Sequence, residues 1–216
     1  MTESEWLAYQ DPTAMLAFLR GKVSDRKLRL LGTGICRQFQ DQIETKAFSD
    51  AIETVEVYAD TGKTKAALKR ARQGVRAIRH GLPSGDKTRV VEWVALWLAE
   101  VAASENAFGG TADELIRLAG EGLVGPDLVT SMVTIMRCVI GRQSFRPNSK
   151  TASWRTSVSV SMAQTIYDDR AFNQLPLLAE ALETAGCTDK DILEHCRDSG
   201  PHVRGCWVVD MLLGKE

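Results

Sequence analysis

This sequence of 216 residues lacks long apolar runs and an excess of charge of one sign. It also lacks a leader segment in which basic residues precede an apolar run. Its most apolar stretch, residues 90–103, is interrupted by Glu92 and Glu100 and is shorter than the roughly 20 residues that span a bilayer. The net charge of −1 provides no general attraction to nucleic acid or to an anionic membrane. Residues 1–6 are acidic and polar, unlike a secretory leader. We therefore expect a cytoplasmic protein with no membrane partner.

Strand signals are also scarce. Residues 158–160 alternate and residues 207–209 form a short apolar run, but neither has an evident partner hairpin. Apolar residues elsewhere recur every three or four positions, which is typical of helices that bury one face. The 44% apolar content is enough for a core. The sequence therefore predicts an all-α fold, either an irregular multi-helix bundle or a short array of helical hairpins, with a smaller C-terminal helical subdomain.

Helix signals also predict how the chain is divided. Two apolar faces, at 48–59 and 68–78, predict a helical hairpin, and the apolar segment 90–101 predicts a central helix containing Trp93 and Trp97. Residues 142–156 have no apolar period and are rich in Gly, Pro, Asn and Ser, as in a linker or long loop. We therefore expect an N-terminal helical bundle over 1–141 and a C-terminal helical subdomain over 157–216.

Both ends of the chain carry segments that resemble an uncharacterised family of planctomycete helical proteins of unknown function. The segments are Glu5-Trp6-Leu7 through Asp11-Pro12, Phe18-Leu19-Arg20-Gly21-Lys22 through Leu30, and Ile166-Tyr167-Asp168-Asp169-Arg170-Ala171-Phe172 through Asp210. The resemblance implies a helical fold and carries no activity. Where members of that family show several cysteines after the first Arg-Leu run, this chain has a single one, Cys36.

Five potential zinc ligands gather near the C-terminal end of the chain: Cys187, His195, Cys196, His202 and Cys206. His195 and Cys196 are adjacent on a predicted helix and would point about 100° apart. Structural zinc ligands usually come in close pairs such as Cys-x-x-Cys, and this set has none. We therefore favour core packing of free thiols and expect no cofactor, with zinc binding as the alternative. The same residues also allow a nucleophilic set in which His202 activates Cys196 or Cys206 and Asp210 orients the histidine, but nothing in the sequence fixes their geometry. We therefore name no catalytic residues and favour a non-enzymatic protein.

A basic helix is predicted over residues 63–79. Five of its cations recur at steps of four and three residues and form one stripe: Lys65, Lys69, Arg72, Arg76 and Arg79. Such a stripe is suited to a phosphate backbone. The alternative is internal pairing with acidic residues of the preceding helix, namely Glu53, Glu56 and Asp60.

These observations leave three functional interpretations. The leading one is a non-enzymatic helical protein-interaction module that binds an unknown protein partner. The alternative is a nucleic-acid-binding or regulatory protein that uses the basic helix. A weaker alternative is a zinc-binding protein that uses the C-terminal cysteines and histidines.

Overall fold

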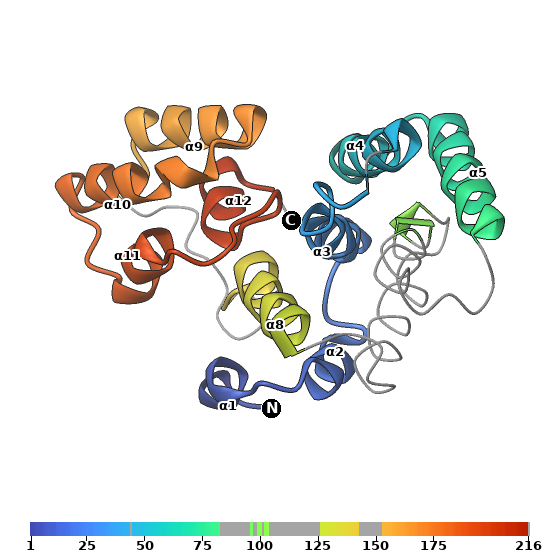
Figure 1. Ribbon diagram of the computed structural model, residues 1–216. Helices are drawn as coiled ribbons and strands as arrows, with labels where there is room; N and C mark the ends of the chain where they lie inside the picture. The colour runs from blue at the N-terminus through green and yellow to red at the C-terminus, as the bar shows by residue number, and fades with distance from the viewer. Residues whose placement is uncertain are drawn as a thin grey trace. The chain divides into compact units, whose positions relative to one another are not determined.

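The computed structural model describes residues 1–43, 45–82, 96, 99–100, 102–103, 126–142 and 153–215. Every element in these ranges is a helix, which confirms the all-α prediction (Figure 1). None of the described helices is long and apolar enough to cross a membrane. The helices are α1 (Glu3–Ala8), α2 (Pro12–Leu19), α3 (Asp25–Arg37), α4 (Lys46–Thr61), α5 (Lys65–Gly81), α8 (Pro126–Ile140), α9 (Ser157–Asp169), the 3₁₀ helix η2 (Phe172–Gln174), α10 (Leu175–Thr184), α11 (Lys190–Arg197) and α12 (Trp207–Leu213).

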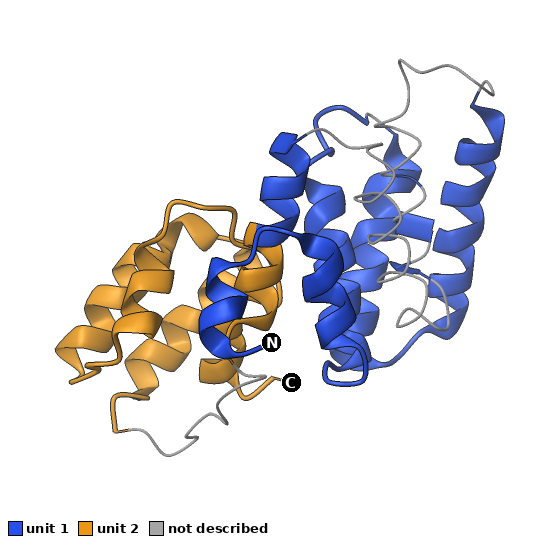
Figure 2. Cartoon of the chain, turned by 90° about the horizontal axis from the view of Figure 1, so that it is seen from below, with its two compact units in different colours: residues 1–133 blue, residues 134–216 orange. Residues whose placement is uncertain are grey.

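The chain forms two compact units, residues 1–133 and residues 134–216 (Figure 2). The division falls inside α8 and not at the predicted boundary after residue 141. The physical reason is that the last turns of α8 pack with the C-terminal helices. Cys138 lies beside His202, and Gly141 lies against the ring of Trp207. Most of the predicted linker, residues 143–152, is outside the described residues.

In the first unit, α3, α4 and α5 pack in succession, and α4 and α5 correspond to the predicted hairpin (Figure 1). The two helices are joined at Gly62, whose φ of 62° is the left-handed conformation that often ends a helix. Val55 of α4 and Leu68 of α5 share a buried cluster with Ala102 and Ala103. Of the predicted central helix over 90–101, only residues 96, 99 and 100 are described, and Trp93 and Trp97 lie outside the described residues.

In the second unit, α9 packs against α10 and α12, and α10 packs against α11. The two segments that showed weak strand signals, 158–160 and 207–209, lie in α9 and α12. Thr156 begins α9 by accepting a hydrogen bond from the backbone N–H of Ser159. This cap stabilises the helical conformation of residues 158–160, whose alternating pattern alone would favour a strand. The apolar faces of these short helices supply the core of the unit, and α11 together with its connection to α12 carries three of the residues considered next.

Candidate metal centre

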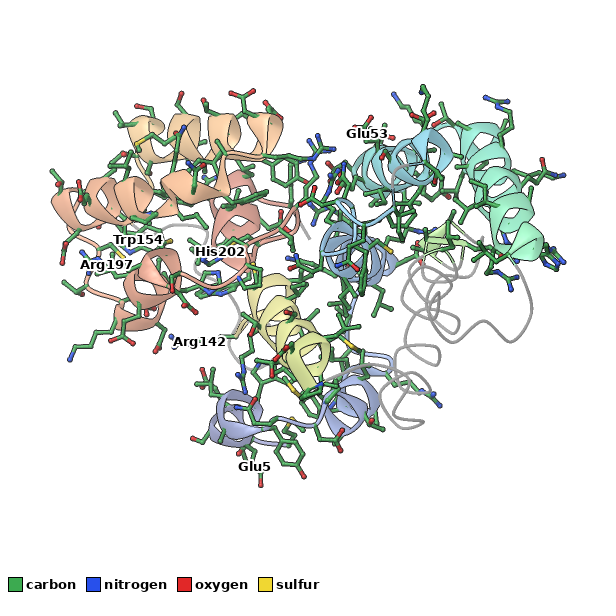
Figure 3. All side chains as sticks on the ribbon, viewed as in Figure 1. Glu5, Glu53, Arg142, Trp154, Arg197 and His202 are labelled. Carbon is green, nitrogen blue, oxygen red and sulfur yellow. The ribbon has the colours of Figure 1, made fainter. Side chains whose placement is uncertain are left out.

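Four ligand atoms from distant parts of the sequence meet in the second unit. The side chains of Cys138, His195, His202 and Cys206 each present one sulfur or ring nitrogen, and these atoms all lie within 4.8 Å of one another. Both cysteines are buried, with 2% of Cys138 and 0% of Cys206 exposed. Figure 3 shows His202 between α11 and α8. Two thiols and two imidazoles are a donor set that tetrahedral zinc favours.

Each ligand has a defined place on the backbone. Cys138 is in the last turn of α8, and His195 is in the second half of α11. Asp189 begins α11 by accepting hydrogen bonds from the backbone N–H groups of Asp191 and Ile192. His202 lies between α11 and α12, and Cys206 is the residue immediately before α12. The cluster therefore connects the end of α8 with α11, with the segment between α11 and α12, and with the residue at which α12 begins.

A tight turn brings Cys206 into the cluster. The backbone N–H of Cys206 donates to the carbonyl of Val203 at 2.9 Å, which closes a four-residue turn. Gly205, the third residue of the turn, has a φ of 91°, a conformation that strongly favours glycine. The turn reverses the chain after His202 and starts α12 with the Cys206 sulfur facing the histidines.

Two of the separations between ligand atoms match those around a single bound zinc ion. The Sγ of Cys206 is 3.2 Å from Nε2 of His195, and the Sγ of Cys138 is 3.5 Å from Nδ1 of His202. Zinc bonds of about 2.3 Å to sulfur and about 2.0 Å to nitrogen place sulfur and nitrogen roughly 3.5 Å apart at a tetrahedral angle. The two separations therefore suit the edges of a zinc tetrahedron.

A second hydrogen bond orients His202. Its Nε2 is 3.0 Å from the carbonyl oxygen of Asp198. Because a carbonyl only accepts, Nε2 carries the hydrogen, and the lone pair of the neutral ring is on Nδ1, the atom that faces Cys138. Metal-binding histidines are usually held in this way by a backbone carbonyl or a carboxylate. The Asp198 backbone thus fixes the tautomer that binding through Nδ1 requires.

Electrostatics in the cluster favour the thiolate of Cys206. Burial alone would raise the pKa of this thiol, but its hydrogen bonds with Cys138, His195 and His202, together with the charge of His195, hold its pKa well below the ordinary value. Burial lowers the pKa of His202, yet its hydrogen bond to Cys206 and the charge of Cys206 outweigh burial and raise it. Thiolate is the form of cysteine that binds metals. Since Cys206 is fully buried, a metal ligand fits its surroundings better than a nucleophile does.

The cluster overlaps only in part with the five residues that the sequence offered as ligands. It contains His195, His202 and Cys206, and it includes Cys138 in place of Cys187 and Cys196. Burial raises the pKa of Cys187 and of Cys196, as for a thiol packed in a core. All five cysteines are buried and none of them forms a disulfide, in line with the expected reduced thiols.

Packing and charge hold the surroundings of the cluster together. The ring of Trp207 lies 5.4 Å from that of His195 between centroids, and His195 meets His202 edge-on at 4.8 Å. Arg142, which follows α8 and is labelled in Figure 3, forms ion pairs with Asp189 at 3.3 Å and with Asp191. These contacts connect the Cys138 end of α8 to the first turn of α11.

The predicted basic stripe lies on α5, in the first unit. Arg79 pairs with Glu100 at 3.0 Å, whereas Arg72 and Arg76 approach the same carboxylate only at 4.0 and 3.9 Å. Lys65 and Lys69 are exposed. Two of the acidic residues proposed as partners of the stripe form ion pairs with α3, Glu56 with Arg37 and Asp60 with Arg26.

Comparisons of the chain with models of protein families, with curated proteins and with solved structures found no match. The resemblance at the two ends of the sequence therefore stays a prediction.

Proposed function

We propose that this protein is a zinc-binding helical module in which Cys138, His195, His202 and Cys206 hold one structural zinc ion. The observation that carries the proposal is the convergence of these four ligand atoms to within 4.8 Å. Two sulfur and two nitrogen donors are characteristic of zinc, whereas calcium and magnesium prefer oxygen. The Asp198 carbonyl behind His202 adds the outer hydrogen bond usual at such sites.

A structural role follows from the number of ligands. Four protein ligands complete tetrahedral zinc, whereas catalytic zinc ordinarily keeps one position for water or substrate. The second unit spans only residues 134–216 and is built from short helices, and small units of this kind often depend on a metal or on disulfides for stability. The zinc would fasten α8, α11 and α12 together around the cluster.

The wider role that we propose is non-enzymatic, namely the binding of a protein partner by a zinc-stabilised helical scaffold. The support is that all four side chains of the cluster would bind the metal, which leaves no coordination position for a substrate. A rigid, metal-fastened set of helices presents a preorganised surface to a partner.

Elemental analysis of the purified full-length chain tests the metal site. We expect about one zinc per chain, lost in Cys138→Ala and in His202→Ala, because three remaining ligands bind zinc far less tightly. Cys196→Ala is the matched control, since Cys196 is equally buried but is outside the cluster, and it should keep its zinc.

Cobalt substitution separates loss of the site from loss of the fold. Cobalt(II) bound by two thiolates in a tetrahedron gives visible and thiolate charge-transfer absorption, and Cys138→Ala should lose the thiolate bands while its circular dichroism stays helical. Wild-type protein that takes up neither zinc nor cobalt would refute the proposal. Equal metal loss in Cys196→Ala would place the site elsewhere.

A further inference from the structure

Helix α5 in the first unit carries a dense set of exposed cations. We use "the basic face of α5" for its exposed basic side chains and that of the preceding turn: Lys63, Lys65, Lys69, Arg70, Arg72 and Arg76. The opposite side of the helix is apolar, with Leu68 and Val75 buried. Figure 3 shows nitrogen-tipped side chains extending outward from α5.

Among the described residues, the carboxylate of Glu100 pairs with α5 and reduces this charge without cancelling it. Glu100 is largely buried, and its strongest contact is with Arg79, whose side chain is only 12% exposed. Arg72 and Arg76 stand near the limit of an ion pair with Glu100, and their side chains remain 44% and 58% exposed. Arg79 is therefore mostly buried and is not part of the exposed stripe. The positive charge of the remaining exposed side chains is larger than the single negative charge of Glu100.

The spacing of these cations suits a regular row of phosphates. Residues three or four apart on a helix are separated by about 5–6 Å along the axis, so Lys65 to Arg76 extends over roughly 16 Å. Each strand of a duplex presents one phosphate per about 3.4 Å of its axis. A row of this length thus faces several phosphates of one strand.

The same face lacks what other anionic partners require. A membrane-binding helix must insert apolar residues, but the large apolar residues Leu68 and Val75 of α5 are buried in its own unit. Protein interfaces are usually anchored by a central cluster that includes Trp or Tyr as well as Arg, and α5 contains no Trp, Tyr or Phe. Binding of single strands relies on aromatic side chains that stack on bases, and this face contains none.

We propose that the basic face of α5 binds the sugar–phosphate backbone of a nucleic-acid duplex without reading its sequence. DNA and RNA share this chemistry, so the two kinds of duplex are separate arms of the test. The inference is independent of zinc binding, because α5 and the metal ligands belong to different units. Contacts to phosphate alone give a dissociation constant of about 10⁻⁴–10⁻⁶ M at physiological salt and a steep salt dependence.

The test is fluorescence anisotropy of labelled 20-base-pair DNA and RNA duplexes with the zinc-loaded full-length chain. About four phosphate contacts predict a slope near −4 for log affinity against log salt on DNA. Lys65→Gln/Lys69→Gln should weaken binding at least tenfold at low salt and reduce the magnitude of the slope by about 2. These lysines are chosen because Glu replacements of Arg72 or Arg76 would repel the buried Glu100.

The matched control is Lys46→Gln/Lys190→Gln, which removes the same charge from exposed lysines outside α5 and should leave affinity within about twofold. Circular dichroism and zinc content of each variant verify that fold and metal are intact. Absence of binding to either duplex at low salt, or equal weakening in the control, would overturn the proposal. Stronger binding to anionic vesicles or to polyglutamate than to both duplexes would overturn it as well.

Discussion

Gly141 packs closely against Trp207 beside the candidate metal centre. Its φ is 55°, and a Cβ at this position would lie 2.1 Å from Cγ of Trp207. The ring of Trp207 in turn lies beside that of His195. A methyl group at residue 141 would therefore push the indole toward a metal ligand.

We predict that Gly141→Ala lowers the free energy of unfolding by about 2–5 kcal/mol, as the sum of left-handed backbone strain and overpacking against Trp207. Gly186→Ala is the control, because Gly186 also has a positive φ, 92°, but has open space where a Cβ would be. Only the backbone cost of about 1–2 kcal/mol applies there. Denaturant unfolding of both variants measures the difference, and equal losses would show that Trp207 does not confine residue 141.

Single residues also show why sequence reasoning brought together only part of the candidate metal centre. His195, His202 and Cys206 attracted attention because they are close in sequence. Cys138 lies 64 residues before His202, and its place in the cluster depends on how α8 packs with the later helices. His195 is in the cluster and its neighbour Cys196 is outside it, because adjacent residues of a helix point about 100° apart. The sequence did offer one signal: the chain has only five cysteines, so few residues other than Cys138 were available as a fourth ligand.

At the scale of elements, the α3–α4 pairing contains a buried ion pair. Both carboxylate oxygens of Glu56 accept hydrogen bonds from the Arg37 guanidinium, at 2.7 and 3.0 Å. Glu56 is 1% exposed. Removing one partner of such a pair leaves a buried charge poorly compensated, which costs far more than the intact pair contributes.

We therefore predict that Arg37→Met destabilises the protein by about 3 kcal/mol. Replacing both partners, in Arg37→Met/Glu56→Met, should recover much of this loss because apolar side chains of similar size need no charge partner. Thermal or denaturant unfolding of the two variants provides the comparison. A double variant that is less stable than Arg37→Met by more than about 1 kcal/mol would contradict this account.

Helix starts were the most predictable feature of the elements. Asp11 and Ser24 cap α2 and α3, each accepting a hydrogen bond from a backbone N–H in the first turn, and residues of these types ahead of an apolar period can be recognised in a sequence. Ahead of α11, Thr188 and Asp189 are both residues that cap helices, and it is Asp189 that accepts from the first turn. The partners of helix faces were harder to predict: Glu56 and Asp60 pair with α3, a choice set by tertiary packing.

At the scale of the whole molecule, the chain consists of two helical units, and we propose a different function for each of them. The first unit carries the exposed basic face of α5, and the second carries the metal ligands. The all-α class followed from apolar periodicity, because nearly every period was helical. The boundary between the units did not follow, because α8 has no break in its helical pattern at residue 133.

We propose that zinc stabilises the second unit. Hydrogen exchange of the full-length chain, measured with and without a zinc chelator, tests this proposal most directly. Structural zinc contributes folding free energy outright, so a loss of about 3 kcal/mol on chelation means roughly hundredfold faster exchange. We predict this acceleration for peptides from the end of α8, α11 and α12, with α3, α4 and α5 unchanged. Unchanged exchange in α11 and α12 after verified metal removal, or equal acceleration in both units, would contradict the account.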